Sequence, residues 1–304
     1  MKIIVTGGAG FIASHVTDAY IKAGHGVVII DNLLTGSRKN INPKAKFYKA
    51  DIRNISSVEN IFRREKPDTV NHHAALASVV ESIRNPIETF DTNILGTLNI
   101  LNAFGKYHAP KRKKFIFAST GGAIYGNPAR LPANEKTDPS PLSPYALSKL
   151  LAEETIKFFA PQSNTEYTIF RYSNVYGPRQ NPFGEAGVVA IFTNLIKAGK
   201  RPTIFGDGTK TRDYVYVGDL VRANVLALRG GKNETINICT RKETSDRNIL
   251  DSIARALDSQ VKPIYAPFRR GEVRHIMMSF DKAKKILGWE PKTKLQEGIV
   301  KTVA

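Results

Sequence analysis

The first two dozen residues place the tightest constraint on what this chain can fold into. A short β-branched run over 2–6 (KIIVT) leads into a glycine turn, and an amphipathic segment then reaches Ala23 and Gly24. Within the turn the spacing is Gly-x-x-Gly-x-x-Ala, starting at Gly7 and including Gly10. Glycine permits a tight turn and close approach of the backbone to a pyrophosphate, and a helix N-terminus supplies free N–H groups. The pattern predicts a strand, turn and helix that bind a dinucleotide.

An acidic residue follows the second expected strand. The apolar run from Val27 to Ile30 ends in Asp31. A carboxylate at this position accepts hydrogen bonds from ribose hydroxyls and repels a 2′-phosphate, which favours NAD over NADP. We expect Asn32 to help to hold the same ribose. The alternative is that Asp31 merely ends a strand.

Short apolar runs alternate with segments of helical periodicity over the first 172 residues. This alternation predicts an α/β fold with a doubly wound parallel sheet and right-handed crossovers. We expect strands near 46–50, 69–72, 113–120 and 168–172 and helices near 56–65, 86–106 and 144–159.

The chain changes character after residue 172. Glycine, proline and arginine become frequent, and this stretch is interpreted as loops that cap the crevice. A strand and helix over 214–228 are expected to return to the first lobe. We predict a Rossmann domain over 1–172, with 213–240 returning to it, and a smaller C-terminal substrate-binding lobe from 173–212 and 241–304.

Three polar residues in the middle of the chain form a candidate reactive group. Tyr145 and Lys149 are four residues apart, so both project from one face if the segment is helical. A neighbouring cation lowers the pKa of a tyrosine and makes it a usable general base. Thr120 follows an apolar strand, and ligands in an open parallel sheet sit at the carboxyl ends of strands. A Tyr-x-x-x-Lys spacing by itself is more often a packing pair.

The net charge of +18 raises the question of nucleic-acid binding. Lysine and arginine are spread along the chain, with a single run over 111–114 that we interpret as a solvated loop. Interleaved aromatic and basic residues, typical of single-strand binders, are not evident. The charge is therefore expected to favour an anionic small ligand and not nucleic acid.

Cysteine, histidine and hydropathy constrain the setting. Cys239 is the only cysteine, so an intrachain disulfide is impossible, and a reducing cytoplasm is expected. We interpret Cys239 as a core residue, and the adjacent His72 and His73 as structural, not as a metal pair. Asn93, inside an expected helix, is a candidate anchor for neighbouring backbone. No apolar run approaches the length of a membrane span.

Several of these signals occur together in a set order. TGGAGFIASH, Asp31, Asp51-Ile52, HHAA, Ser119-Thr120, Tyr145-x-x-x-Lys149 and RYSNVYGPRQ together resemble the extended short-chain dehydrogenase/reductase family over almost the whole chain. The segments FGDGTKTRDYVYVGDL and GEVRHIMMSFDKAKKILGWEP are similar to its nucleotide-sugar epimerase branch, of the UDP-glucose (UDP-galactose) 4-epimerase type.

The resemblance implies a role for each matching position. Tyr145 would be the catalytic base, Lys149 would bind the nicotinamide ribose and depress the tyrosine pKa, and Thr120 would bind the sugar oxygen that is oxidised. Asn174 would hold the sugar diphosphate, and Arg212 and Arg274 would pair with it. Val188, Val189 and Phe205 would line the uridine pocket. The residues implied to contact NAD are Gly7, Gly10, Phe11, Ile12, Asp31, Asn32, Asp51, Ile52, Ala74 and Lys149.

The implied reaction interconverts UDP-glucose and UDP-galactose through a 4-keto sugar, with transient hydride transfer to bound NAD. Related 4,6-dehydratases carry an Asp-Glu pair directly after the threonine, whereas this chain has Gly121 and Gly122, which are expected to leave room for the sugar to turn. Other NAD(P)-dependent nucleotide-sugar enzymes remain alternatives, namely a UDP-N-acetylhexosamine or UDP-uronate epimerase, or a dehydratase or reductase.

Two further expectations come from the resemblance. The position that admits or excludes bulky N-acetyl sugars falls on Ile276, which leaves that specificity open. The family commonly forms homodimers through a four-helix bundle, and the helices near 89–106 and 145–159 are the candidates here.

Overall fold

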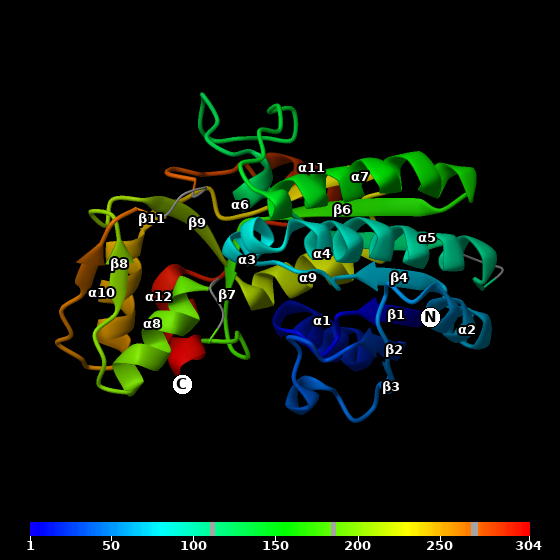
Figure 1. Cartoon of the computed structure of the whole chain (residues 1–304), viewed down its shortest axis with the longest axis horizontal. Helices are drawn as coiled ribbons and strands as arrows, with labels where there is room; N and C mark the ends of the chain where they lie inside the picture. Colours follow the sequence, from blue (N-terminus) through cyan, green and yellow to red (C-terminus); the bar gives the residue numbers. More distant parts are fainter. Residues whose placement is uncertain (110–112, 184–186, 269–272) are drawn as a thin grey trace.

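A parallel sheet forms the centre of the larger part of the molecule (Figure 1). The structure is a computed structural model that describes residues 1–109, 113–183, 187–268 and 273–304. The expected α/β doubly wound fold is confirmed. The sheet contains β1 (Lys2–Thr6), β2 (Gly26–Asp31), β3 (Lys46–Lys49), β4 (Thr69–His72), β5 (Lys114–Thr120), β6 (Glu166–Tyr172) and β10 (Glu234–Ile238).

The strand order across the sheet is β10-β6-β5-β4-β1-β2-β3, and every neighbouring pair is parallel. From β1 the chain adds strands on one side up to β3 and then on the other side from β4 onward, so the order reverses between β1 and β4. Such a reversal opens a crevice at the carboxyl ends of the strands. Both faces of the sheet are covered, as the alternation along β1 shows. Ile3 and Val5 pack against one group of helices, whereas Ile4 packs against the other. Period-two burial on both faces explains why these strands are nearly continuous apolar runs.

The helices divide between these two faces. The face with Ile3 packs against α1 (Phe11–Lys22), α9 (Val217–Ala227) and α11 (Asp281–Leu287). The face with Ile4 packs against α2 (Ile55–Glu65), α5 (Gly96–Lys106) and α7 (Pro144–Gln162). The remaining helical segments near this sheet are η1 (Arg38–Asn40), α3 (Val79–Arg84), α4 (Pro86–Phe90), the π-helix η2 (Asp91–Leu95) and α6 (Gly121–Ile124).

Local signals set the start of α7. The Ser143 side chain accepts a hydrogen bond from the backbone N–H of Ala146, and Pro144 occupies the first helical position. Serine satisfies a free N–H at the cap, and proline has no N–H to satisfy there. Tyr145 therefore lies in the first turn, close to the end of β5.

A second group of elements forms the smaller part of the molecule (Figure 1). Its core joins apolar residues of three helices and the adjoining strands. The helices are α8 (Val188–Lys197), α10 (Asp246–Ala256) and α12 (Leu295–Val303). One sheet contains β7 (Asn174–Tyr176), β9 (Thr211–Tyr216) and β11 (Glu243–Ser245), and another contains β8 (Thr203–Phe205) and β12 (Ile264–Ala266).

Two expectations for this region were wrong in detail. The strand near residue 214 does not return to the large sheet, because β9 pairs with β7 and β11 while β10 covers the edge of β6. The helix that follows it, α9, does return and packs on α1. The stretch interpreted as capping loops contains α8, whose Val189 and Phe192 are buried in the smaller core.

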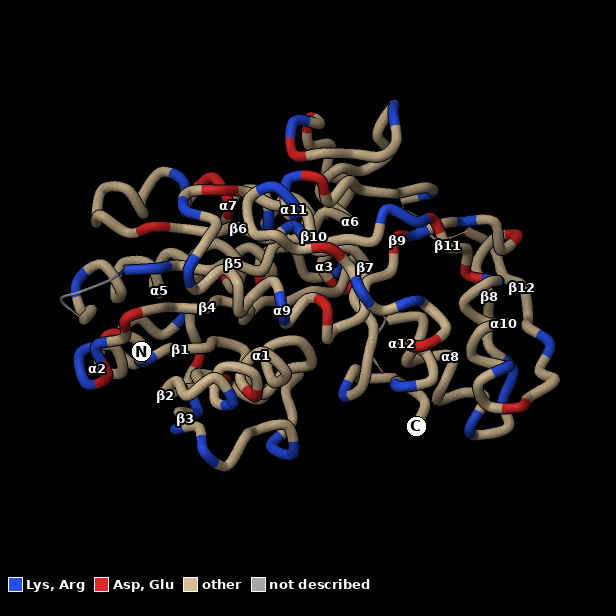
Figure 2. The backbone as a smooth tube through the Cα atoms, turned by 180° about the vertical axis from the view of Figure 1, so that it is seen from behind, with Lys and Arg blue, Asp and Glu red and all other residues tan. Residues whose placement is uncertain are grey.

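Charged residues are distributed along the whole chain, as Figure 2 shows. The basic run was expected to be a solvated loop. Its first two residues lie outside the described residues, but Lys114 is buried at the start of β5, where its Nζ donates to the Gly230 carbonyl at 3.0 Å. Within the described ranges, no helix has both the length and the apolar character needed to cross a membrane.

Candidate functional site

The glycine turn between β1 and α1 forms a close-fitting cradle. Gly7 has φ +69, and a Cβ there would lie 2.8 Å from the backbone nitrogen of Ala74. A Cβ at Gly10 would lie 3.0 Å from the Gly7 carbonyl oxygen. Gly10 caps α1 without a side-chain hydrogen bond, and the first turn carries no acidic residue. The first-turn N–H groups and the dipole of α1 therefore face an anion without local competition.

Asp31 at the end of β2 is held by backbone donors. Its Oδ2 accepts from the Ala9 N–H at 3.0 Å and its Oδ1 from the Leu33 N–H at 2.7 Å. The carboxylate is buried and so is fixed beside the glycine cradle. Each carboxylate oxygen has a second lone pair that remains for ribose hydroxyls. The residue thus both ends the strand and faces the turn.

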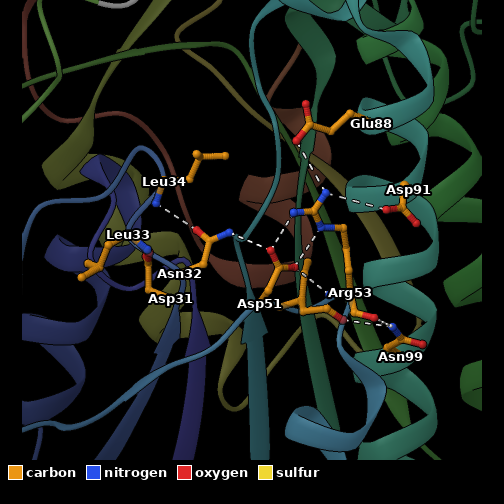
Figure 3. Close-up of polar contacts among 10 residues, drawn as sticks. Asp31, Asn32, Leu33, Leu34, Asp51, Arg53, Glu88, Asp91 and Asn99 are labelled. Carbon is orange, nitrogen blue, oxygen red and sulfur yellow. Dashed lines mark hydrogen bonds and ion pairs between the residues drawn. The ribbon is translucent and has the colours of Figure 1, made fainter.

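Asp51 carries the second carboxylate at this edge (Figure 3). The Asn32 amide donates to its Oδ2 at 3.0 Å. Arg53 donates from Nε to Oδ1 at 3.0 Å and from Nη2 to Oδ2 at 2.8 Å. The Arg53 hydrogen bonds lower the pKa of Asp51 to about 2, against the opposing effect of burial. Asp51 is therefore an ionised acceptor throughout the neutral pH range.

One cleft joins most of the residues predicted to bind the cofactor. Gly7, Gly10, Asp31, Asn32, Asp51, Ile52 and Ala74 line it together. Phe11, Ile12 and Lys149 lie outside its lining, and Ile12 packs against the core. The sequence analysis did not foresee the lining residues Arg53 and Thr92, and it assigned His73 a purely structural role. A charged residue directly after Asp51-Ile52 was the available signal for Arg53.

The reactive group is assembled from two elements. Thr120 ends β5, and its side chain interacts with the Tyr145 phenol in the first turn of α7, where it favours a lower tyrosine pKa. Lys149, one turn further along α7, is buried and donates from Nζ to the Ala118 carbonyl at 2.8 Å. That ammonium also lies 4.6 Å from the Phe117 ring centroid. All three predicted residues meet at the carboxyl end of β5.

The expected lowering of the tyrosine pKa is wrong for these contacts. Burial raises the pKa of Tyr145 to about 12, and the Thr120 hydrogen bond opposes this only in part. Burial also lowers the pKa of Lys149 to about 7, although the Glu153 carboxylate opposes that change. Desolvation penalises both charged forms and is the largest cause of each shift. A phenolate at Tyr145 thus needs more positive charge than Lys149 supplies.

A buried ion pair lies beneath this group. Arg171 on β6 donates from Nε to Glu153 Oε1 at 3.0 Å and from Nη2 to Oε2 at 2.8 Å. The Ser119 hydroxyl donates to the same carboxylate, and Arg171 Nη1 donates to the Tyr125 hydroxyl at 3.0 Å. Glu153 is one turn beyond Lys149 on α7, so this network fixes the helix that carries Tyr145.

The two histidines have different surroundings. His72 Nδ1 and Nε2 lie 2.6 Å and 3.0 Å from the hydroxyls of Thr6 and Thr97, and burial lowers its pKa well below the usual value. His73 stacks on Tyr172 and lines the cleft, and its buried Nδ1 has no hydrogen-bond partner among the described residues. Burial lowers the pKa of His73 to about 3, so it is neutral.

Asn93 anchors the π-helix to its surroundings. Its Oδ1 accepts from the Leu76 N–H at 2.8 Å, and its Nδ2 donates to the Leu76 carbonyl at 3.0 Å and to the Ser148 hydroxyl at 2.9 Å. The predicted backbone anchor is confirmed. These bonds join the loop after β4, which lines the cleft, to α7, which carries the tyrosine.

The two glycines after Thr120 do not leave free space beside their Cα atoms. A Cβ at Gly121 would collide with the Met278 side chain. A Cβ at Gly122 would lie 3.0 Å from Asn174 Oδ1. The expectation that they leave room for a turning sugar is therefore wrong at Gly121, because Met278 fills that volume. Gly122 instead lets the Asn174 side chain lie close to the Gly122 Cα atom.

The residues predicted to bind the sugar nucleotide lie in the smaller sheets and α8. Arg212 Nη1 donates to the Arg274 carbonyl at 3.3 Å, so these two arginines are neighbours. The Arg274 guanidinium lies 5.4 Å from the Phe268 ring centroid. Val188 and Val189 begin α8, and Phe205 ends β8. Val189 is buried in the smaller core, whereas Phe205 is half-buried.

Ile276 and Cys239 belong to one apolar cluster. Both are buried there with Tyr125, Ala133 and Met278. Burial raises the pKa of the Cys239 thiol well above its usual value, which suits the predicted core role. Ile276 is also covered by this cluster.

These features fit a dinucleotide. Gly7 leaves no space for a Cβ and a Cβ at Gly10 would be tightly fitted, α1 offers an uncapped N-terminus, and Asp31 and Asp51 line the same cleft. The unpartnered Nδ1 of His73 is a buried polar atom in the same cleft. Buried polar groups are ordinarily paired, so an unpaired one in a cleft indicates a ligand.

Comparisons with known proteins agree with this geometry. Residues 3–239 match the model of the NAD dependent epimerase/dehydratase family. A putative UDP-glucose 4-epimerase of Methanocaldococcus jannaschii is 48% identical over 301 residues, which are 99% of this chain and 97% of that protein.

Two solved structures are also similar over their whole length. The UDP-glucose 4-epimerase of Thermotoga maritima with UDP-glucose has a TM-score of 0.97 and 47% identity, and covers 100% of this chain and 97% of that one. The Thermus thermophilus UDP-glucose 4-epimerase in complex with NAD has a TM-score of 0.94, 41% identity and coverage of 100% and 98%. Together with the glycine cradle and the Thr120, Tyr145 and Lys149 arrangement, they show that this chain belongs to the NAD-dependent epimerase/dehydratase family of extended short-chain dehydrogenases/reductases.

Proposed function

We propose that this NAD-dependent nucleotide-sugar epimerase interconverts UDP-glucose and UDP-galactose by inversion at C4 of the sugar. The observation that carries the proposal is that Thr120, Tyr145 and Lys149 meet at the carboxyl end of β5. The two hydroxyls that meet there can both bind one sugar hydroxyl. The full-length similarity to UDP-glucose 4-epimerases supports the choice of sugar nucleotide.

The residues of the chain divide the proton chemistry between them. Tyr145 Oη takes the proton of the sugar 4-hydroxyl, holds it and returns it to the same oxygen. Thr120 Oγ1 donates to that oxygen and keeps it in reach of the phenol. Lys149 binds the ribose next to the reacting ring and adds a positive charge. Bound NAD would supply the hydride acceptor and donor for C4 and a further positive charge that favours the Tyr145 phenolate.

The smaller lobe would keep the nucleotide bound while the sugar turns. We propose that 173–212 and 241–304 form this lobe beside the NAD-binding domain of 1–172 and 213–240, except that all of β9 pairs within the lobe and α11 packs on the NAD-binding domain. Asn174 and the neighbouring Arg212 and Arg274 are placed to hold a diphosphate, because guanidinium groups form paired bonds with phosphate. Val188, Val189 and Phe205 are the proposed uridine contacts.

Elimination of water is disfavoured by the same site. Gly121 and Gly122 occupy the positions that follow Thr120, and neither can supply a proton to a leaving hydroxyl. Simple inversion needs no acid there. This argues against the dehydratase alternative.

We also propose that two copies associate. The helices η2 to α5 and α7 pack side by side and expose apolar side chains. Leu147, Leu151 and Phe158 lie at a spacing of four and seven residues on α7, with Leu95 exposed on η2. Such a stripe suits a four-helix bundle with a second copy. Light scattering of Leu147→Glu with Leu151→Glu should report monomer, and a wild-type monomer would contradict the proposal.

The buried free thiol suggests a reducing location, and we propose the cytoplasm. The activity test uses UDP-galactose with the purified chain, and sugar products are read by proton NMR. UDP-glucose should form without net NADH, and Tyr145→Phe should lower kcat roughly 10²- to 10⁴-fold. Full activity in Tyr145→Phe would exclude the base. Conversion of UDP-N-acetylhexosamines or UDP-glucuronate alone would reassign the sugar.

A further inference from the structure

Arg53 is the most heavily engaged side chain on the wall of the cofactor cleft (Figure 3). Besides its two side-chain bonds to Asp51, its own backbone N–H donates to Asp51 Oδ1 at 2.9 Å. The geometry is a planar fork on both oxygens of one carboxylate. Such a pair holds orientation as well as charge.

The position of Arg53 is itself fixed from behind. Asn99 on α5 donates from Nδ2 to the carbonyls of Ile52 and Arg53, at 3.0 and 3.1 Å. The outer nitrogen of the guanidinium, Nη1, lies 3.5 Å from Glu88 Oε1 and 3.8 Å from Asp91 Oδ2. The cation therefore lies among three carboxylates. Its main-chain and outer contacts leave little freedom for the fork to rotate away from Asp51.

Asp51 needs such support because of its place in the turn. It follows β3 at the start of a loop and is partly exposed. An exposed loop carboxylate has several rotamers, and each bond that it makes to a ligand then costs side-chain entropy. Asn32, which directly follows β2, and Arg53 supply four donors, so each Asp51 oxygen accepts two hydrogen bonds while the carboxylate lines the cleft.

We propose that Arg53 is a positioning residue for NAD, whose guanidinium fork fixes the ionised Asp51 carboxylate in the wall of the cofactor cleft. This inference deepens the proposed function and rests on it only for the identity of the cofactor. Arg53 contacts Asp51 and acts through it.

Two further facts agree with this role. The lowering of the pKa of Asp51 to about 2 has the Arg53 hydrogen bonds as its largest cause. Asp51 is faced by Arg53 and Asn32, and Arg53 in turn by Glu88 and Asp91. Without the guanidinium the carboxyl returns toward its ordinary pKa, and the acceptor loses its fixed direction.

The test measures NAD affinity by calorimetric titration of the full-length protein. Arg53→Gln should weaken binding about tenfold, the size of one lost charge-assisted hydrogen bond. Arg53→Lys keeps the charge but not the fork, so its affinity should lie close to that of Arg53→Gln. Arg63→Gln is the matched control, because it removes one exposed guanidinium from α2, where it lies over the Tyr107 ring.

A double-mutant cycle separates positioning from direct contact. In an Asp51→Asn background, Arg53→Gln should weaken NAD binding by less than about twofold, because the group it positions has changed. A full tenfold loss in that background would mean that Arg53 binds NAD itself and would overturn the proposal. Wild-type affinity in Arg53→Gln, or complete rescue by Arg53→Lys, would also overturn it.

The outcomes are distinct from those that test the proposed function. NAD binding by the wild-type chain reports on the cofactor alone, and UDP-galactose conversion reports on the reaction. A wild-type chain that binds NAD but converts no UDP-galactose leaves the Arg53 comparison intact. A wild-type chain that does not bind NAD would contradict both proposals.

Discussion

Two arginine–carboxylate forks in this molecule have nearly the same geometry and opposite surroundings. Arg171 and Glu153 are 2.8 Å apart with side chains 5% and 0% exposed, whereas Arg53 and Asp51 are 2.8 Å apart with side chains 33% and 28% exposed. A buried pair leaves an uncompensated charge if one partner is removed, but a partly exposed pair is screened by water. The same type of contact therefore stabilises the fold where it is buried, at Arg171 and Glu153, and orients a side chain where it is partly exposed, at Arg53 and Asp51.

The largest expected effect is the loss of the buried carboxylate. Glu153→Gln should lower the free energy of unfolding by about 3–5 kcal/mol, because Arg171 is left without its counter-ion in the core. Urea denaturation measures it. Glu154→Gln is the control, since Glu154 is exposed and pairs with Lys157, and its effect should stay under about 1 kcal/mol. Equal losses of unfolding free energy in the two variants would show that burial does not determine how much each ion pair contributes to stability.

Helix caps near each fork give a smaller effect. Ser143→Ala removes the cap of α7, and Asn54→Ala removes the cap of α2, where Asn54 Oδ1 accepts from the Ser57 N–H at 2.9 Å. Each should lower the free energy of unfolding by about 1 kcal/mol. Only Ser143→Ala should also lower kcat, since Tyr145 lies in the first turn of α7. A loss of kcat in Asn54→Ala would contradict the expectation that only the N-terminus of α7 affects catalysis.

The exposed fork should contribute little to folding. Asp51→Asn should change the free energy of unfolding by less than about 1 kcal/mol, while NAD affinity falls. The two quantities are measured on one protein, by urea denaturation without nucleotide and by calorimetry with it. A stability loss as large as that of Glu153→Gln would remove the contrast between the forks.

The smallest effect is a pH dependence. The pKa of Asp51 is lowered to about 2 when folded, so its contribution to stability is complete above its unfolded pKa, near 4, and is lost as the pH falls through about 2. The stability difference between wild type and Asp51→Asn should therefore be constant above pH 4 and shrink below it. A stability difference that shrinks only above pH 4 would contradict a lowering of the Asp51 pKa on folding.

The sequence could predict the parts of the molecule that depend on neighbours along the chain. The glycine cradle, Asp31 and the pairing of Tyr145 with Lys149 depend on local spacing, and the structure brings them to one edge of the sheet. Alternating apolar runs likewise predicted the doubly wound sheet. Contacts between residues distant in sequence were harder to predict. β9 was recognisable as a strand, but its sheet was not, because burial pattern identifies a strand and not its neighbour.

Charged residues were the hardest to assign. Glu153 on a helix and Arg171 in a strand carry no sign that they meet 18 residues apart in the core. Lys114 belonged to a basic run and is nevertheless buried. The pKa of Tyr145 was predicted in the wrong direction because spacing reveals a neighbouring cation but not the desolvation that outweighs it.

The place of β10 has a consequence for the making of the protein on the ribosome. β10 covers β6, yet 61 residues lie between Tyr172 and Glu234. At 5–20 residues per second, the nascent chain waits about 3–12 s after β6 is complete before its neighbour is synthesised. Throughout that interval β6 is an unpaired apolar edge. The wait for β10, more than the stability of the finished sheet, sets how long this edge stays open during synthesis.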